Sequence, residues 1–246
     1  MALSFDEYGS GENKTLLLLH GAGVLDTFCR QYGLARRYRL VVPHLPGAGR
    51  AARIPYEPEA TVQALRGLLE RIGKEKVGLL GHSLGGQMAV RLVCECPERI
   101  GAAAFLSVWA EPDPRILRLY SGMGGLAAPM MRWKGLVRLQ AAYWHFSADR
   151  AQAMVDSAAQ TTPEVWRSFF AHPLRLSELP AYESVGVPML AVCGSRETRG
   201  IRESLALLGR NPHCHTNVIA GAGHDFPMRH PEKLNPMLEA FFSKHL

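Results

Sequence analysis

The pentapeptide Gly81-His82-Ser83-Leu84-Gly85 restricts the fold of this chain more than any other feature. An apolar run over residues 76–80 precedes it, which is typical of a strand buried on both faces. A helical pattern over residues 87–96 follows it and ends before Pro97. In so sharp a strand-to-helix turn the serine adopts a strained backbone, and the flanking glycines remove side chains that would clash. We therefore expect Ser83 to stand exposed at the carboxyl end of a buried strand.

Strand patterns and helix patterns alternate along most of the chain. Further short apolar or β-rich runs predict strands at residues 15–19, 38–42, 102–108, 189–193 and 216–219. Steps of three and four between apolar residues predict a helix at 61–72, with Thr61 as its N-cap, and amphipathic character predicts a closing helix at 231–246. This alternation predicts an α/β fold with a mostly parallel central sheet and helices on both faces. There is room for one short strand before Thr15.

The alternation is interrupted between residues 111 and 182, where the pattern is mostly helical. Because the strand pattern resumes afterwards, we interpret residues 111–182 as a helical cap insertion and residues 1–110 and 183–246 as the α/β core. The insertion is rich in Met and aromatic residues, which favours an apolar, adaptable pocket. The alternative is that most of these side chains form the core of the cap itself.

Composition argues against several classes of protein. The net charge is +6, but Lys and Arg are scattered rather than gathered in a stripe, so we expect no nucleic-acid partner. No apolar stretch reaches the roughly 18–20 residues of a membrane helix, and the N-terminus lacks a signal-peptide pattern, so we expect a cytoplasmic protein without a membrane span. The five cysteines show neither a disulfide framework nor zinc-binding spacing, so we expect reduced thiols and no metal.

Four motifs occur in an order that resembles the α/β-hydrolase fold family. Residues 16–21 resemble the family's strand and oxyanion turn, residues 46–49 resemble its next loop, and residues 221–224 resemble its histidine loop. The turn around Ser83 is similar to the family's nucleophile elbow. The resemblance covers nearly the whole chain. It implies that Ser83 is a nucleophile and that His224 is its general base, with the acid of the triad lying between them in the chain.

More than one position competes for that acid. In the family the acid commonly follows the penultimate strand, and there this chain has Glu197 where Asp is usual. A Glu can orient the imidazole, although its extra methylene changes its reach. Glu111 and Asp113 follow the preceding strand and are the alternatives, because some family members place the acid there. Asp225, next to His224, is expected to point away.

The resemblance also implies an oxyanion hole made by the backbone N–H groups of Leu84 and Ala22, with Gly23 as the alternative to Ala22. His20 is expected to brace this loop rather than to react. The candidates for contact with the substrate are Gly21, His82, Trp109 and Phe226, and from the insertion Met130, Trp133, Tyr143 and Trp144.

The implied activity is hydrolysis of a small or medium carboxylic ester or thioester through an acyl-enzyme, with no cofactor and a small-molecule substrate. A C–C hydrolase, a lyase and an aminopeptidase use the same constellation and remain alternatives. A small-molecule receptor on the same fold is the alternative from another class. Reactions that need an Asp nucleophile are disfavoured because position 83 is Ser. The identity of the substrate and the oligomeric state are not determined by the sequence.

Overall fold

A central seven-stranded sheet organises the part of the chain that the computed structural model describes, residues 2–11, 13–73 and 75–246. Its strands are β1 (Phe5–Tyr8), β2 (Thr15–Leu19), β3 (Arg39–Pro43), β4 (Val77–His82), β5 (Ile100–Leu106), β6 (Met189–Gly194) and β7 (Cys214–Ile219). Their order in the sheet is β1-β3-β2-β4-β5-β6-β7. Strand β1 is antiparallel to β3, and the other neighbours are parallel. The predicted mostly parallel α/β sheet is confirmed.

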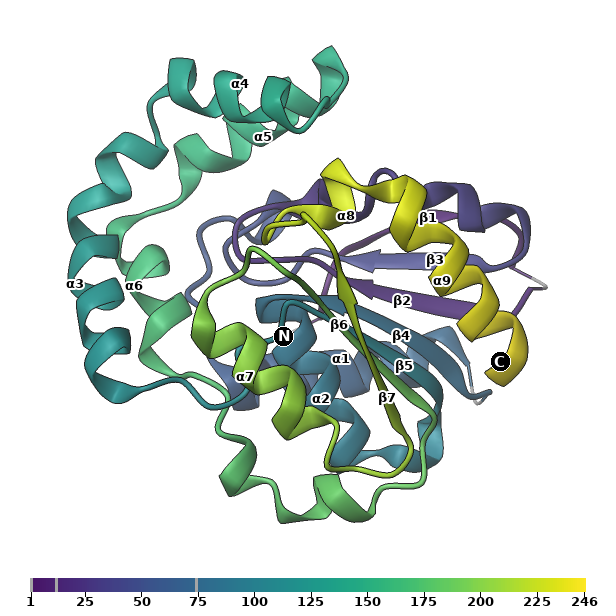
Figure 1. Ribbon diagram of the computed structural model, residues 1–246. Helices are drawn as coiled ribbons and strands as arrows, with labels where there is room; N and C mark the ends of the chain where they lie inside the picture. The colour runs from purple at the N-terminus through teal and green to yellow at the C-terminus, as the bar shows by residue number, and fades with distance from the viewer. Residues whose placement is uncertain (1, 12, 74) are drawn as a thin grey trace.

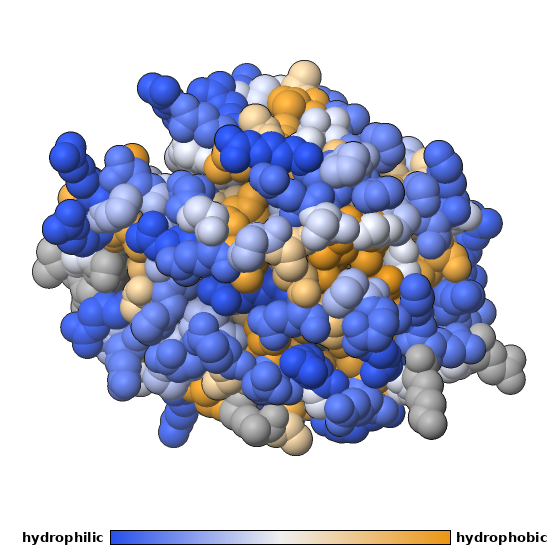
Figure 2. Space-filling model, turned by 90° about the horizontal axis from the view of Figure 1, so that it is seen from below, coloured by the Kyte–Doolittle hydropathy of each residue, from blue (hydrophilic) through white to orange (hydrophobic). Residues whose placement is uncertain are grey.

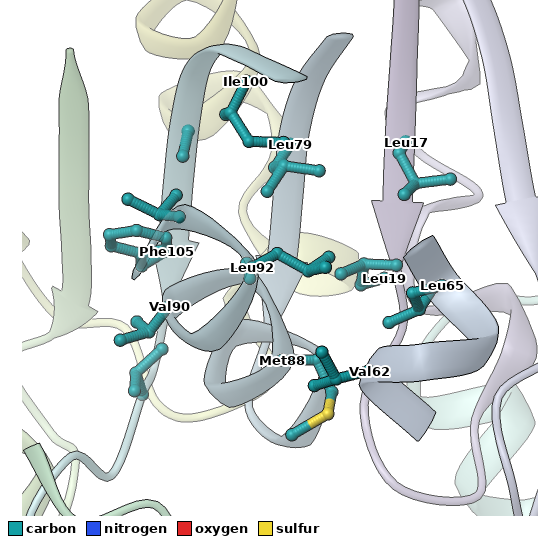
Figure 3. Packing of buried hydrophobic residues seen from close by; sticks show 14 of the residues in the cluster. Leu17, Leu19, Val62, Leu65, Leu79, Met88, Val90, Leu92, Ile100 and Phe105 are labelled. Atoms are coloured by element: carbon teal, nitrogen blue, oxygen red, sulfur yellow. The ribbon is translucent and has the colours of Figure 1, made fainter. Parts of the chain in front are cut away.

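Helices cover both faces of this sheet (Figure 1). Helices α1 (Pro58–Ile72), α2 (Leu84–Glu95) and α7 (Arg199–Leu208) contribute to the core on one face, and α8 (Phe226–Arg229) and α9 (Pro231–His245) to the core on the other. Strand β2 shows why two cores form. Successive side chains of a strand point to opposite faces, so Leu17 and Leu19 join the first core while Leu16 and Leu18 join the second. Figure 3 shows Leu17 and Leu19 packing with residues of α1 and α2.

Two predicted helix starts differ from the structure. Helix α1 begins at Pro58 with Glu57 at the N-cap position, so Thr61 is not the cap. Proline is favoured at the first helical position because its fixed φ suits a helix. Helix α2 begins at Leu84 rather than at residue 87. The two glycines that follow Leu84 are poor helix formers, and this low propensity placed the predicted start too late.

Four further helices lie between β5 and β6 in the chain: α3 (Pro114–Met131), α4 (Lys134–Tyr143), α5 (Ala148–Gln160) and α6 (Pro163–Ala171). They lie together beyond the end of the sheet toward which the strand arrows of β2 and β3 point (Figure 1). After α6 the chain returns to the core, where the Leu176 N–H donates to the Ala110 carbonyl at 2.8 Å. Tyr182 is fully buried there and donates its hydroxyl to the Leu208 carbonyl.

Polar contacts join the α4–α5 end of these helices to the core. The Arg229 guanidinium lies 4.4 Å from the centre of the Tyr143 ring and donates to the Tyr143 carbonyl at 2.7 Å. On α5, Arg150 pairs with Asp26 at 3.1 Å. These contacts place α4 next to helix α8 and α5 next to the segment that follows β2.

Short 3₁₀ helices complete the chain at Leu25–Phe28, Tyr32–Arg36, Gly49–Ala51, Pro97–Arg99, Leu176–Glu178 and Pro180–Ser184. The five cysteines, all within the described ranges, are free. Figure 2 shows a face covered mostly by hydrophilic residues, with apolar residues emerging between them in small groups. In the described residues, no helix combines the length and the apolar character that crossing a membrane requires.

The close approach of α2 to β2 generates the first prediction. A Cβ at Gly85 would lie 2.0 Å from the Leu19 carbonyl oxygen, so Gly85→Ala forces two backbones apart. We expect this substitution to lower the free energy of unfolding by about 1–3 kcal/mol. The control is Gly67→Ala in α1, where a Cβ meets nothing within 4 Å. It should raise stability by about 0.5–1 kcal/mol, because Gly is costly inside a helix. Urea denaturation measures the free energy of unfolding of both variants. If the two substitutions change it equally, the close contact between α2 and β2 does not require glycine at position 85.

Candidate active site

Ser83 is the single residue between β4 and α2, and its backbone is strained. Its φ of 53° lies in the left-handed region that residues with a side chain rarely adopt. Its N–H donates to the Leu106 carbonyl at 2.8 Å, which ties the turn to the neighbouring strand. A Cβ at Gly81 would lie 2.5 Å from the Gly85 carbonyl oxygen, so the turn requires the glycine there. The serine is half-buried, at the carboxyl end of the sheet.

His224 and Glu197 come together from the loops that follow β7 and β6. The His224 Nδ1 lies 2.9 Å from Oε2 of Glu197. Because a carboxylate oxygen only accepts, Nδ1 carries the hydrogen in this pair, and Nε2 is left able to accept a proton. The Glu197 Oε1 accepts a hydrogen bond from the Ser107 hydroxyl and a long one, 3.4 Å, from the Gly194 N–H. Both carboxylate oxygens therefore have donors.

The environment of Glu197 favours its charged form. The residue is 6% exposed, and this burial alone would raise the pKa of its carboxyl. The hydrogen bond and the charge of His224, followed by the Ser107 hydroxyl, act in the opposite direction and lower the pKa below its ordinary value. The result is an ionised carboxylate held against the imidazole, which fixes the imidazole's tautomer and orientation.

His82 supports the His224 loop from beneath. Its Nε2 donates to the His224 carbonyl at 2.8 Å, and the two ring centres are 4.8 Å apart. Burial lowers the pKa of His82 to about 3, so its ring is neutral. A Cβ at Gly21 would lie 2.9 Å from Nδ1 of His82, which explains the glycine at that position. The His82 ring thus packs into the elbow and also borders the cavity.

The candidate oxyanion donors lie beside Ser83. The Leu84 N–H is the first of α2 and has no acceptor within the helix, and it lies at the positive end of the helix dipole. Ala22 follows β2, in a turn that His20 braces: its Nδ1 lies 2.8 Å from the Gly21 carbonyl, and its Nε2 accepts from Leu45 N–H at 3.0 Å. This is the bracing role predicted for His20 from the sequence.

Two cavities meet at Ser83. Both are bordered by Ser83, His224 and Ala22. Chamber 1 has a volume of about 260 Å³, and its wall includes Gly21, His82, Met131, Val137, Trp144, Met154, Ala158, Trp166, Asp225 and Met228. Chamber 2 has a volume of about 370 Å³, and its wall includes Leu84, Gln87, Trp109, Leu117, Tyr120, Phe169, Phe170, Arg196, Glu197 and Ile201. Of the predicted substrate contacts, Gly21, His82, Trp109 and Trp144 therefore border these chambers.

Other predicted contacts lie elsewhere. Phe226 has no exposed surface, because it packs in the core beneath His82 with its ring edge-on at 6.5 Å, so the expectation that it contacts substrate is corrected. Met130, Trp133 and Tyr143 are 59%, 67% and 56% exposed, and none of them lines either chamber.

The alternative acids have other partners. Glu111 accepts from the Ser177 N–H at 3.0 Å, and its other oxygen lies 3.6 Å from Arg175. Asp113 accepts from the Arg115 N–H at 2.7 Å at the start of α3. The structure thus brings Glu197, rather than Glu111 or Asp113, to His224.

Two polar residues at the site were not predicted. Ser107 follows β5 with a φ of 54° and donates to Glu197. In the sequence, Ser107 could have been found only from its position directly after a buried strand, since it then lies at the same edge of the sheet as Ser83. Asp225, expected to point away, borders chamber 1 and accepts from Trp144 Nε1 at 3.2 Å. Within the described residues, no group of three or more His, Cys, Asp or Glu is arranged to hold a metal ion.

The lowered pKa of Glu197 generates a prediction about stability. Its folded-state pKa is below its unfolded-state value, so the carboxylate stabilises the fold above the unfolded pKa, about 4.3, and this contribution disappears as the pH falls through the folded pKa. We therefore expect wild type to lose stability relative to Glu197→Gln as the pH falls from 5 to 3, so that the difference in free energy of unfolding between them shrinks. Urea titrations at each pH measure it, and a difference that stays constant over this range contradicts the prediction.

Comparison with known proteins supports one family. The alpha/beta hydrolase family model matches residues 16–236. A protein of Caulobacter sp. (strain K31), named as a proposed carbamate hydrolase RutD, is 25% identical over 95% of this chain and 92% of its own length. The 2-hydroxy-6-oxononadienedioate/2-hydroxy-6-oxononatrienedioate hydrolase 1 of Dechloromonas aromatica (strain RCB) is 24% identical over 99% of this chain and 91% of its own length.

A solved structure shows the same fold. The thermophilic esterase of Thermogutta terrifontis superposes with a TM-score of 0.77 at 21% identity, covering 99% of this chain and 94% of the esterase. Because the family model spans most of the chain, from β2 into α9, the match includes the Ser83 turn and the loops that carry Glu197 and His224. The chain belongs to the alpha/beta hydrolase family.

Proposed function

We propose that this protein is a serine hydrolase that cleaves small or medium carboxylic esters or thioesters. The observation that carries the proposal is the 2.9 Å contact between His224 Nδ1 and the buried Glu197 carboxylate, beside cavities that Ser83 also borders. A buried carboxylate that orients an imidazole next to a strained serine is the arrangement that activates a hydroxyl nucleophile. Relatives named as hydrolases and esterases support an enzyme.

In the proposed mechanism, Ser83 Oγ forms a bond to the carbonyl carbon while its proton passes to Nε2 of His224. The N–H groups of Leu84 and Ala22 stabilise the oxyanion that develops. The bond from the carbonyl carbon to the leaving oxygen or sulfur then breaks. His224 returns the proton to that leaving atom, which departs as an alcohol or a thiol. Water then attacks the acyl carbon while His224 accepts a proton from it. The bond from that carbon to Ser83 Oγ breaks as His224 gives the proton to Oγ, which releases the carboxylic acid and restores Ser83.

A C–C hydrolase is the second candidate function. The relative from Dechloromonas aromatica, whose name describes hydrolysis of an oxo-diene diacid, aligns with nearly the whole chain. The same Ser83, His224 and Glu197 would serve that chemistry. A small-molecule receptor remains the alternative outcome if the serine proves unreactive.

Ester turnover tests the nucleophile. We expect wild type to hydrolyse p-nitrophenyl esters from the C2 to C12 series and to be labelled by a fluorophosphonate probe. Ser83→Ala should lose labelling and lower kcat by roughly 10³-fold or more, because it removes the nucleophile. If wild type is labelled but turns over no ester, the C–C hydrolase becomes the better assignment. Failure of labelling indicates a receptor, and activity retained by Ser83→Ala contradicts the mechanism.

The proposed acid is tested by two matched substitutions. Glu197→Gln keeps the size of the side chain but removes the charge that stabilises protonated His224, so we expect kcat to fall by roughly 10³–10⁴-fold with little change in KM. Glu111→Gln should leave kcat within about twofold, because Glu111 contacts Ser177 and Arg175 instead. The reverse pattern in steady-state kinetics would transfer the role to Glu111.

A further inference from the structure

Two pairs of helices form the roof over the two chambers. Helix α4 packs against α5, and α3 packs against α6; the pairs occupy separate parts of the roof in Figure 1. Val137 of α4 and Ala158 of α5 line chamber 1. Leu117 of α3 and Phe170 of α6 line chamber 2. Met131 of α3 and Trp166 of α6 also line chamber 1, so α3 and α6 border both chambers, whereas α4 and α5 border chamber 1 alone. The Ser83 turn lies where the chambers meet.

Chamber 1 has a mostly apolar wall. Met131, Met154 and Met228 supply flexible thioether side chains, which adapt to irregular ligands. Its carboxylate, Asp225, accepts a hydrogen bond from the Trp144 indole, so one of its oxygens is already occupied. The chamber therefore favours an apolar group over a cation.

Chamber 2 has an aromatic wall. The Tyr120 and Phe170 rings stack with centres 6.1 Å apart, and Trp109 stands edge-on to Tyr120 at 6.0 Å. Arg196 borders this chamber but is exposed to solvent. The inner surface of chamber 2 is thus suited to an apolar or aromatic group.

Both chambers are large enough to hold a substantial group. An apolar cavity of about 150 Å³ holds a benzene molecule, and the chambers measure about 260 Å³ and 370 Å³. Ser83, His224 and Ala22 border both, so a carbonyl at the serine is adjacent to both chambers. A substrate with only one apolar arm would leave the other apolar wall in contact with water, which is unfavourable.

We propose that the substrate is an ester or thioester with a sizeable apolar group on both sides of the scissile carbonyl. The acyl group occupies one chamber and the alcohol or thiol group occupies the other. This inference rests on the proposed hydrolase function and narrows its substrate class. It predicts that acetate esters and methyl esters are hydrolysed less efficiently than esters with two long arms.

The test is a grid of four esters: methyl acetate, hexyl acetate, methyl hexanoate and hexyl hexanoate, with the released acid titrated. Each methylene removed from water contributes a factor of about four. We therefore expect lengthening of either arm to raise kcat/KM at least about tenfold. A gain of less than tenfold for either arm overturns the proposal.

Two substitutions assign the arms to the chambers. Ala158→Trp narrows chamber 1, and Leu117→Trp narrows chamber 2. We expect each variant to lose the gain in kcat/KM from lengthening one arm and to keep the gain from lengthening the other arm. The arm that loses its gain should differ between the two variants. The controls are Gln160→Trp and Arg118→Trp, exposed positions on the same two helices that border neither chamber, and both should behave as wild type. If both chamber variants affect the same arm, the proposal is wrong.

Binding of ketones separates this inference from the proposed function, because it needs no turnover. The isomers 7-tridecanone and 2-tridecanone have the same composition, but only the first carries a long arm on each side of the carbonyl. We expect 7-tridecanone to bind wild type at least about tenfold more tightly, because several more methylenes leave water. Equal affinities overturn the two-chamber inference, even if esters are hydrolysed. Failure of fluorophosphonate labelling instead overturns the proposed hydrolase function.

Discussion

The site depends on a backbone-to-backbone contact between helix α2 and the sheet. A Cβ at Gly85 would lie 2.0 Å from the Leu19 carbonyl oxygen, and one at Gly86 would lie 2.4 Å from a Val108 methyl group. Only glycine permits this approach. The approach compresses the connection between β4 and α2 to one residue, so Ser83 is held at a positive φ that it would not adopt alone. The packing of α2 therefore maintains the strain, and the serine is presented to the cavity as a result.

The charged part of the site follows from the direction of the strands. Parallel neighbours β5, β6 and β7 end at one edge of the sheet, so the loops after them bring Ser107, Glu197 and His224 together. The three residues are far apart in the chain, yet they form one hydrogen-bonded row. Glu197 tolerates burial because both of its oxygens accept hydrogen bonds. Its longer side chain, compared with Asp, still reaches the imidazole.

The helices between β5 and β6 determine the shape of the site rather than its chemistry. Helices α3 and α6 border both chambers, and α4 and α5 border chamber 1. The core side chains that would react lie where the chambers meet. Contacts such as the hydrogen bond from Trp144 to Asp225, next to His224, connect this roof to a loop of the core. These helices thus supply part of the chamber walls, and core residues such as Met228 and Trp109 supply the rest.

The sequence by itself determined six of the seven strands to within two residues, the mostly parallel sheet and the turn that carries Ser83, because buried strands and glycine-rich turns leave local patterns. It left the acid open among Glu197, Glu111 and Asp113, and it placed Phe226 at the substrate and overlooked Ser107. Only the tertiary structure decided these points, since they depend on which way a loop side chain points once helices and strands have packed. Phe226 points into the core, whereas Glu197 points to His224. Spacing along a chain carries no information about such directions.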